Sequence, residues 1–381
     1  MLDSTFFRAC EAAAAAWDVP ALAIGASVGG RVETFSVGCA VDTRFRIASI
    51  TKPFTATLAL QLLDPEEATG VWPGDVRVCH LLAHTSGYDS EYGDLVRFGD
   101  DDDALAGVVA ELPGIRRYLA AEQAWSYANS GYWLAGWLAA EQAGQPYEEA
   151  LAERILRPAG LESTSFGEPD VAGTGRDAAA GPYPRARRPS GGLVSNVADL
   201  LRFGDWHLKQ PQSDRLRSVH GKPTAGVYGL GLFGERVGGV PVWGHGGSYG
   251  GFQTSLLVIP ERDAVFVGLT NSSVGEHALA ALQDEFFERL LGARRRVPDP
   301  VDLPAAALER FAGTYETGDE RIYVAAAPEG LVVSLDEAEF HTRAIGPSTF
   351  EITDGEWIRA RFDFPLPGFG RFGNRLAERV A

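Results

Sequence analysis

The segment Ser49-Ile-Thr-Lys52 places a hydroxyl nucleophile and an ammonium group three residues apart, directly before an apolar run of helical character. Residues at positions i and i+3 share a helix face, so the Lys52 amine can lie against Ser49 Oγ and help remove its proton. Pro53 is tolerated only in the first turn of a helix, where its missing N–H would have had no partner. We therefore predict that the helix begins beside Ser49, with the positive end of the helix dipole near the hydroxyl.

The same pattern has a plain alternative, a serine that caps a helix followed by an exposed lysine. Two further short motifs follow it along the chain, Tyr127-Ala-Asn129 and His245-Gly-Gly247-Ser248. Taken singly, each is short enough to occur by chance, and a half-buried tyrosine or a histidine at a strand end would explain it. Their occurrence together and in this order indicates a serine nucleophile site.

In these motifs the chain resembles the serine hydrolase superfamily of class C β-lactamases, D-alanyl-D-alanine peptidases, D-aminopeptidases and β-lactamase-like esterases. The likeness covers roughly residues 5–292. It includes four longer stretches, at residues 45–54, 80–87, 125–132 and 191–195. The resemblance implies an α+β protein of the β-lactamase/transpeptidase-like fold.

The resemblance also implies that Ser49 attacks a carbonyl carbon and forms an acyl-enzyme. A free lysine has a pKa of about 10.4, so Lys52 needs burial or a cationic neighbour to act as the base. Tyr127 is the other candidate base; it would need Lys52 to stabilise its phenolate, and it could later return a proton to the leaving group. The sequence leaves these two alternatives open.

The remaining site residues are also carried over from the family. Asn129 would orient Lys52 and the amide of the substrate, and the backbone N–H groups of Ser49 and Ser248 would form the oxyanion hole. The third motif would bind substrate through His245, Gly246 and Gly247. In this family the motif often begins with lysine, and a neutral imidazole binds a carboxylate less strongly than an ammonium group does. Efficient β-lactam hydrolysis is therefore disfavoured.

A competing motif overlaps the third one, because residues 246–250 match the G-x-S-x-G nucleophile elbow of α/β-hydrolases. That elbow requires a strand before Ser248, a helix after it, and an acid and a histidine downstream. The residues after Ser248 read as a strand, so we favour Ser49. His80 and His84 have the spacing of zinc ligands but lack the glutamate of H-E-x-x-H, and we assign them a structural role.

Composition limits the partners. The chain has 381 residues, of which 45% are hydrophobic, and a net charge of −17, which disfavours nucleic acid and anionic membranes. Three cysteines without CxxC spacing argue against disulfides and zinc, and we expect no metal and no cofactor. Arg8, Glu11 and Asp18 interrupt the alanine-rich start, which we read as a helix of the fold, and we expect a cytoplasmic protein. The oligomeric state is open.

Periodicity predicts a sheet built from both ends of the first 293 residues. Two hairpins are expected, one at residues 21–28 and 31–37 and one at 253–259 and 264–270. Helices are expected at 5–17 and 276–292, and helical runs dominate residues 54–210. These elements predict an antiparallel sheet flanked by helices, with an all-helical lobe opposite and a cleft between them.

After residue 293 we predict a linker followed by a second, smaller domain. Residues 294–304 have the proline and charge content of a linker, and residues 305–381 alternate apolar and polar positions in short runs. We expect strands there at residues 321–325, 331–335, 349–352 and 358–364. This small antiparallel β module is similar to the lipocalin-like modules that some family members carry.

We therefore predict a serine hydrolase with an acyl-Ser49 intermediate that cleaves a small carboxylic ester or a D-configured amide or peptide, and we favour the esterase. The alternatives are a D-stereospecific aminopeptidase or carboxypeptidase, or a peptide acyltransferase or cyclase of the penicillin-binding-protein type. A non-catalytic ligand-binding module is a further alternative.

Overall fold

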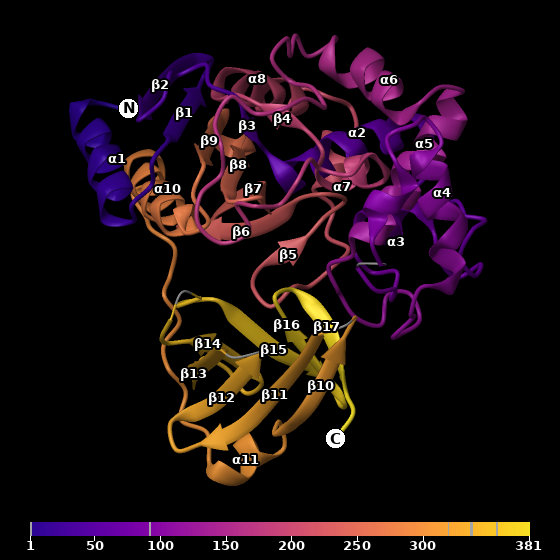
Figure 1. The fold of residues 1–381 in the computed structure, drawn as a ribbon. Coiled ribbons are helices and arrows are strands. Elements are labelled where there is room, and N and C mark those ends of the chain that lie inside the picture. The colour runs from indigo at the N-terminus through magenta and orange to yellow at the C-terminus, as the bar shows by residue number, and fades with distance from the viewer. Residues whose placement is uncertain (1, 91–92, 319, 336–337, 356) are drawn as a thin grey trace.

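The computed structural model describes residues 2–90, 93–318, 320–335, 338–355 and 357–381. The chain forms a larger body, in which helices surround a seven-stranded antiparallel sheet, and a smaller closed barrel of eight antiparallel strands beneath it (Figure 1). The predicted α+β class, with a helical lobe and a C-terminal β module, is confirmed.

The sheet of the body has the strand order β2-β1-β9-β8-β7-β6-β5. Both predicted hairpins are present, and β1 pairs with β9 along its whole length, from Leu22 opposite Thr270 to Val28 opposite Ala264. The two ends of the body therefore meet in the centre of one sheet. Its strands are β1 (Leu22–Val28), β2 (Arg31–Val37), β5 (Val227–Tyr228), β6 (Phe233–Val237), β7 (Val240–Tyr249), β8 (Phe252–Ile259) and β9 (Ala264–Thr270).

Helices cover both faces of this sheet. The predicted terminal helices, α1 (Ser4–Ala16) and α10 (Gly275–Leu291), pack against each other and share a hydrophobic core with the sheet (Figure 1). On the opposite face α8 (Val197–His207) packs on β1 and β9. A Cβ atom at Gly25 of β1 would lie 2.3 Å from Val197, so glycine permits the close approach of α8.

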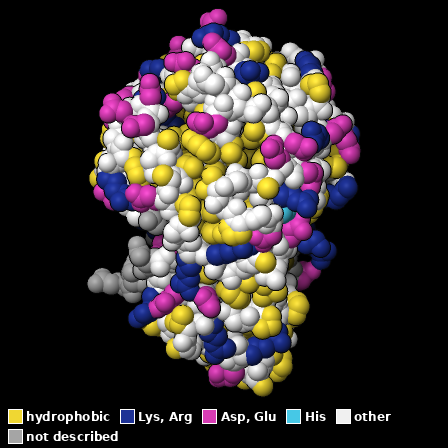
Figure 2. Space-filling view, turned by 90° about the vertical axis from the view of Figure 1, so that its right-hand side faces the viewer, with side chains coloured by type: hydrophobic (Ala, Val, Ile, Leu, Met, Phe, Trp, Pro, Cys, Tyr) yellow, Lys and Arg dark blue, Asp and Glu magenta, His cyan; other side chains and the backbone are white. Residues whose placement is uncertain are grey.

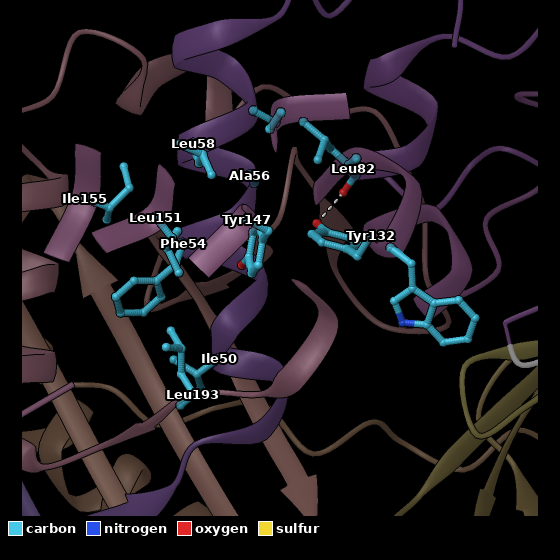
Figure 3. Close-up of a cluster of buried hydrophobic side chains, with 14 of the residues drawn as sticks. Ile50, Phe54, Ala56, Leu58, Leu82, Tyr132, Tyr147, Leu151, Ile155 and Leu193 are labelled. Carbon is cyan, nitrogen blue, oxygen red and sulfur yellow. Dashed lines mark hydrogen bonds between the residues drawn. The ribbon is translucent and has the colours of Figure 1, made fainter. Parts of the chain in front are cut away.

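The helical lobe is built around α2 (Thr51–Leu62), whose first ten residues are all buried. Figure 3 shows Phe54 and Leu58 of this helix among side chains from other helices, including Tyr147 and Leu151. A helix that is buried on every side is fixed by its neighbours rather than by an amphipathic face. The other helices of the lobe are α3 (Val78–Leu82), α4 (Ala104–Glu111), α5 (Asn129–Ala143), α6 (Tyr147–Leu151), α7 (Arg188–Gly191) and α9 (Ser213–Leu216), and β3 (Phe45–Arg46) pairs with β4 (Val194–Ser195).

The C-terminal barrel follows a short helix, α11 (Ala305–Glu309), and closes between β10 and β17. Its interior is filled by aromatic side chains, among them Phe311, Phe350 and Phe364. We propose that residues 305–381 form a domain of their own, joined to residues 1–293 by residues 294–304, which contain neither helix nor strand. The strands are β10 (Gly313–Thr317), β11 (Glu320–Ala327), β12 (Gly330–Leu335), β13 (Ala338–Ala344), β14 (Thr349–Ile352), β15 (Arg361–Leu366), β16 (Phe369–Phe372) and β17 (Arg375–Arg379).

Two strand predictions need correction. The strand expected at residues 358–364 begins only at Arg361, because the preceding residues form a turn in which Arg359 has a left-handed φ of 72°. The strand predicted after the third motif is present as β8, but the sequence predicted no strand at residues 240–249, where β7 contains both His245 and Ser248. Glycines at 244, 246 and 247 lower the strand propensity of this segment, but pairing with β8 over Trp243–Tyr249 overrides it.

None of the helices in the described residues is both long and apolar enough to cross a bilayer.

The last residue of α8, His207, is a buried histidine that belongs to none of the three motifs. His207 is 2% exposed, and neither of its ring nitrogens has a hydrogen-bond partner among the described residues. Its ring lies 5.6 Å from that of Phe203, centroid to centroid. Burial, more than the charge of Arg217, lowers the pKa of His207 from 6.5 to about 4.

His207→Leu should make the fold less sensitive to acid. Between pH 6.5 and 4 the unfolded chain binds a proton at His207 that the folded chain excludes, so the stability associated with the neutral ring is present above pH 6.5 and is lost as the pH falls. The full shift corresponds to roughly 3 kcal/mol. Urea unfolding at several pH values should give a flatter decline for the variant, and parallel declines for both proteins would contradict the assignment.

Candidate active site

Ser49 lies in a single 3-10 turn, Ala48–Ile50, that leads directly into α2 at Thr51. The predicted helix start beside Ser49 is therefore confirmed. Ala48 has a left-handed φ of 44°, a conformation that costs energy for a residue with a Cβ atom and bends the chain sharply before the serine.

Lys52 is fully buried one turn further along α2. Its Nζ donates to Ser49 Oγ at 3.2 Å, to Asn129 Oδ1 at 2.7 Å and to the carbonyl oxygen of Ser190 at 2.7 Å. An ammonium group would donate one N–H to each of these three oxygens. A neutral amine would donate to two of the oxygens and point its lone pair at the third. The geometry therefore connects the amine directly to the hydroxyl of Ser49.

The second motif lies against the same amine. Tyr127 precedes α5, which begins at Asn129, and Lys52 Nζ lies 4.7 Å from the centre of the Tyr127 ring. Ser49, Tyr127 and Asn129 line one cleft. The structure thus brings together the residues that the first two motifs predicted.

His84, to which the sequence gave only a structural role, holds the segment that carries Tyr127. Its carbonyl oxygen accepts the N–H of Ser126 at 2.9 Å, and its Nδ1 accepts the N–H of Ala128 at 3.0 Å. Its ring lies 4.2 Å from that of Tyr127, centroid to centroid. Burial, followed by the nearby charge of Lys52, holds the pKa of His84 well below its usual range, so the ring is neutral. His80, by contrast, accepts the N–H of Arg77 at the start of α3.

The third motif forms the end of β7 that lies beside the Ser49 turn. A Cβ atom at Gly247 would lie 2.2 Å from the carbonyl oxygen of Ile47, so only glycine allows β7 to approach this closely. Thr254 of β8 donates to the same carbonyl oxygen at 3.1 Å. Ser248 and Ser49 line the cleft together, as an oxyanion hole built from their backbone N–H groups requires.

His245 also lines the cleft, but it carries no charge. Its side chain is 3% exposed, and Nδ1 donates to the carbonyl oxygen of Gly246 at 2.6 Å. Burial, followed by the charge of Lys52, lowers the pKa of His245 to about 3. At neutral pH this position offers a substrate carboxylate no cation.

The competing elbow at Ser248 lacks the setting that it needs. Ser248 lies within a strand rather than at a strand-to-helix turn, and its Oγ accepts a hydrogen bond from Gln253 at 2.9 Å. Of the downstream histidines, His277 stacks on Trp17 and His341 pairs with Asp354 in the barrel. The geometry therefore favours Ser49 over Ser248.

The cleft has a volume of 1610 Å³ and is bordered by both the body and the barrel. Figure 2 shows the barrel in contact with the body, beneath it. The barrel contributes residues 357–360, in the turn before β15, and residues 373–375, in the turn before β17 and at its first position, and the sequence did not connect either with the site.

The site and the fold together define a serine hydrolase. The chain belongs to the β-lactamase family, whose model matches residues 7–286. The resemblance seen in the sequence is thereby confirmed.

Curated relatives are identical to this chain at about a quarter of the aligned residues. Penicillin-binding protein 4 of Amycolatopsis lactamdurans is 28% identical over 336 residues, covering 74% of this chain and 86% of that protein. A D-aminopeptidase of Brucella anthropi is 26% identical over 327 residues, covering 78% of this chain. The alignment spans only 60% of that D-aminopeptidase, and 34% of one from Cereibacter sphaeroides.

Solved structures confirm the β-lactamase/transpeptidase-like fold. The crystal structure of SurE with D-Leu has a TM-score of 0.80 at 22% identity and covers 99% of both chains. The D-amino acid amidase of Ochrobactrum anthropi, complexed with L-phenylalanine amide, has a TM-score of 0.65 at 22% identity, covering 75% of this chain and 99% of that one.

Gly247→Ala should displace the Ser49 turn, because its new Cβ would overlap the carbonyl oxygen of Ile47. We expect overpacking to cost about 1–3 kcal/mol of stability. Acylation of Ser49 should slow by about 10²-fold if the oxyanion hole is misaligned. The rate of labelling by a fluorophosphonate and the Tm measure both effects.

Gly246→Ala is the matched control, because its Cβ would lie 3.5 Å from the nearest atom, the carbonyl oxygen of Thr254. It should keep the Tm of the wild type. Equal effects of the two substitutions on stability would contradict the close packing at Gly247.

Proposed function

We propose that this protein is a serine hydrolase that forms an acyl-Ser49 intermediate from peptides or amides containing a D-configured residue. The observation that carries the proposal is the Lys52–Ser49 contact of 3.2 Å, which lies beside a strand edge that has no neighbouring strand among the described residues.

That edge belongs to β7. Its neighbour β6 pairs only with residues Val240–Gly244, so in the described part of the chain the residues from His245 to Tyr249 have no strand on that side. Gly246 and Ser248 are exposed in the cleft. An extended peptide can add to such an edge through main-chain hydrogen bonds, whereas a small ester makes no use of them. The edge therefore supports an amide or peptide over the ester that the sequence alone favoured.

The D configuration is supported by the printed names of relatives. They include D-aminopeptidases, a D-stereospecific amidohydrolase from Streptomyces sp. and SurE, whose structure was solved with D-Leu. The identities are between 22% and 26%, so these names guide the choice of substrates rather than decide it.

In the proposed reaction, Lys52 accepts the proton of Ser49 as Oγ attacks the carbonyl carbon. Complete burial disfavours the charged form of Lys52 and so favours its use as the base. The N–H groups of Ser49 and Ser248 stabilise the oxyanion, and Tyr127 donates a proton to the departing amine. Water then attacks the acyl group and gives its proton to the deprotonated Tyr127, and Ser49 Oγ leaves with the proton held by Lys52, which restores all three side chains.

Transfer of the acyl group to an amine is a second candidate. The size of the cleft, 1610 Å³, and the barrel turns that border it favour a substrate of several residues, one end of which could serve as the nucleophile. Addition of an amino acid amide would then divert the acyl-enzyme from hydrolysis to a new amide.

Intact-protein mass spectrometry tests the proposal with the p-nitroanilides of D- and L-alanine, p-nitrophenyl acetate and benzylpenicillin. We expect an adduct or turnover with the D-anilide, little with the L-anilide, and neither in Ser49→Ala. Turnover that survives in Ser49→Ala would refute the assignment of the nucleophile. A reaction with p-nitrophenyl acetate alone would contradict the proposed amide or peptide substrate and support an esterase instead.

Lys52→Met should slow acylation by about 10²–10⁴-fold, because it removes the proposed general base. Lys209→Met is a matched control, since Lys209 is exposed, follows the end of α8 and does not line the cleft. Progress curves for the D-anilide or for a fluorophosphonate give both rates. A Lys52→Met protein that acylates as fast as Lys209→Met would exclude Lys52 as the base.

A further inference from the structure

The peptide groups around Tyr127 are held from two sides. As described above, His84 accepts the N–H groups of Ser126 and Ala128 from within the body. The N–H of Tyr127 itself points the other way and donates to the carbonyl oxygen of Asn374 in the barrel, at 2.9 Å. A residue more than 200 positions away in the sequence thus holds the backbone of the proposed proton donor.

Asn374 belongs to the two-residue turn between β16 and β17. Gly373 and Asn374 have φ values of 52° and 71°, and Phe372 pairs with Arg375 across the hairpin. Two central residues with positive φ are typical of a type I′ turn, which matches the twist of the flanking strands. Both residues are exposed, and both line the cleft.

The turn is fixed to the body by further contacts on either side of it. The N–H of Leu376 donates to Ser126 Oγ at 3.0 Å, and Arg371 donates to the carbonyl oxygen of Trp125 at 2.9 Å. Arg371 is 3% exposed and forms an ion pair of 2.6 Å with Asp363. Three consecutive residues of the body, 125–127, are therefore each hydrogen-bonded to the barrel.

A second route connects the barrel with the segment that carries Asn129. The N–H of Gly318, in the turn after β10, donates to Tyr118 OH at 3.1 Å, and Tyr118 OH donates to Asp89 Oδ2 at 2.8 Å. The adjacent Ser90 accepts the N–H of Asn129 through its Oγ at 3.0 Å. The barrel thus braces Tyr127 and Asn129, two of the residues that lie against Lys52.

We propose that the β16–β17 turn is a positioning element of the active site, which holds Tyr127 in place against Lys52. This inference rests on the proposed function. The contact is between main-chain atoms, so it fixes where the tyrosine lies without taking part in the reaction. A misplacement of about 1 Å at a reacting group can cost roughly 10²-fold in rate.

Asn374→Pro tests the turn without touching the core of the barrel. Proline fixes φ near −65° and cannot adopt the left-handed conformation of Asn374, so the carbonyl oxygen must move. Asn374→Gly is the matched variant, because glycine adopts positive φ freely. Gly368→Pro places the same strain, at φ 79°, in the turn at the other end of β16, away from Tyr127.

The rate of Ser49 labelling by a small fluorophosphonate is the first readout. We expect Asn374→Pro to be labelled about 10–100-fold more slowly than the wild type, and Asn374→Gly and Gly368→Pro to remain within about twofold. The pH dependence of labelling should also change in Asn374→Pro alone, because Tyr127 moves relative to Lys52. Labelling of Asn374→Pro at the wild-type rate would overturn the inference, as would an equal loss in Gly368→Pro.

Amide hydrogen exchange is the second readout and needs no activity. Peptides covering residues 125–130 should lose protection in Asn374→Pro and keep it in the other two variants. Unchanged protection would overturn the inference even if the rate fell. If the wild type is not labelled at all, the proposed function fails, whereas the exchange data still decide whether the turn holds Tyr127.

Discussion

The structure depends on the burial of one amino group, that of Lys52. A buried polar group without hydrogen-bond partners costs free energy in either protonation state, so Lys52 requires oxygen partners with good geometry. These come from three separate segments, at Ser49, Asn129 and Ser190, which lie just before α2, at the start of α5 and in α7. The packing of the helical lobe is therefore a condition for the chemistry, because any shift between these helices breaks a contact of the lysine.

The same constraint reaches into the sheet. The Ser49 turn is pressed against β7 at Gly247, and Thr254 fixes the carbonyl oxygen of Ile47 beside it. Lobe and sheet are thereby joined within two residues of Ser49 and Ser248, whose N–H groups are proposed to bind the oxyanion. This close contact between two backbone segments leaves Ser49 little freedom to move. A site that is already arranged in this way needs little rearrangement when negative charge develops on the substrate oxygen.

The parts of the site that depend on side-chain chemistry and local geometry could be predicted from the sequence. Pro53 located the helix start, and the three motifs named residues that the fold brings to one cleft. The strand at His245 was missed because glycine-rich segments have low strand propensity, and only pairing with β8 reveals it. The contact between Tyr127 and Asn374 joins two backbone groups, so no residue type at either position could have signalled it. His84 stood within a recognised stretch, but its two bonds to the chain around Tyr127 depend on tertiary structure.

The pairing of β1 with β9 has a consequence for how the protein is made. β1 is complete after residue 28, yet its inner partner β9 begins at residue 264. During synthesis β1 therefore has only its hairpin partner β2, and an isolated hairpin is marginally stable in water. The apolar face of this hairpin stays exposed until most of the chain has left the ribosome, and contacts of such sequence separation form slowly. The central pairing of the sheet can therefore form only after residues 264–270 have been synthesised.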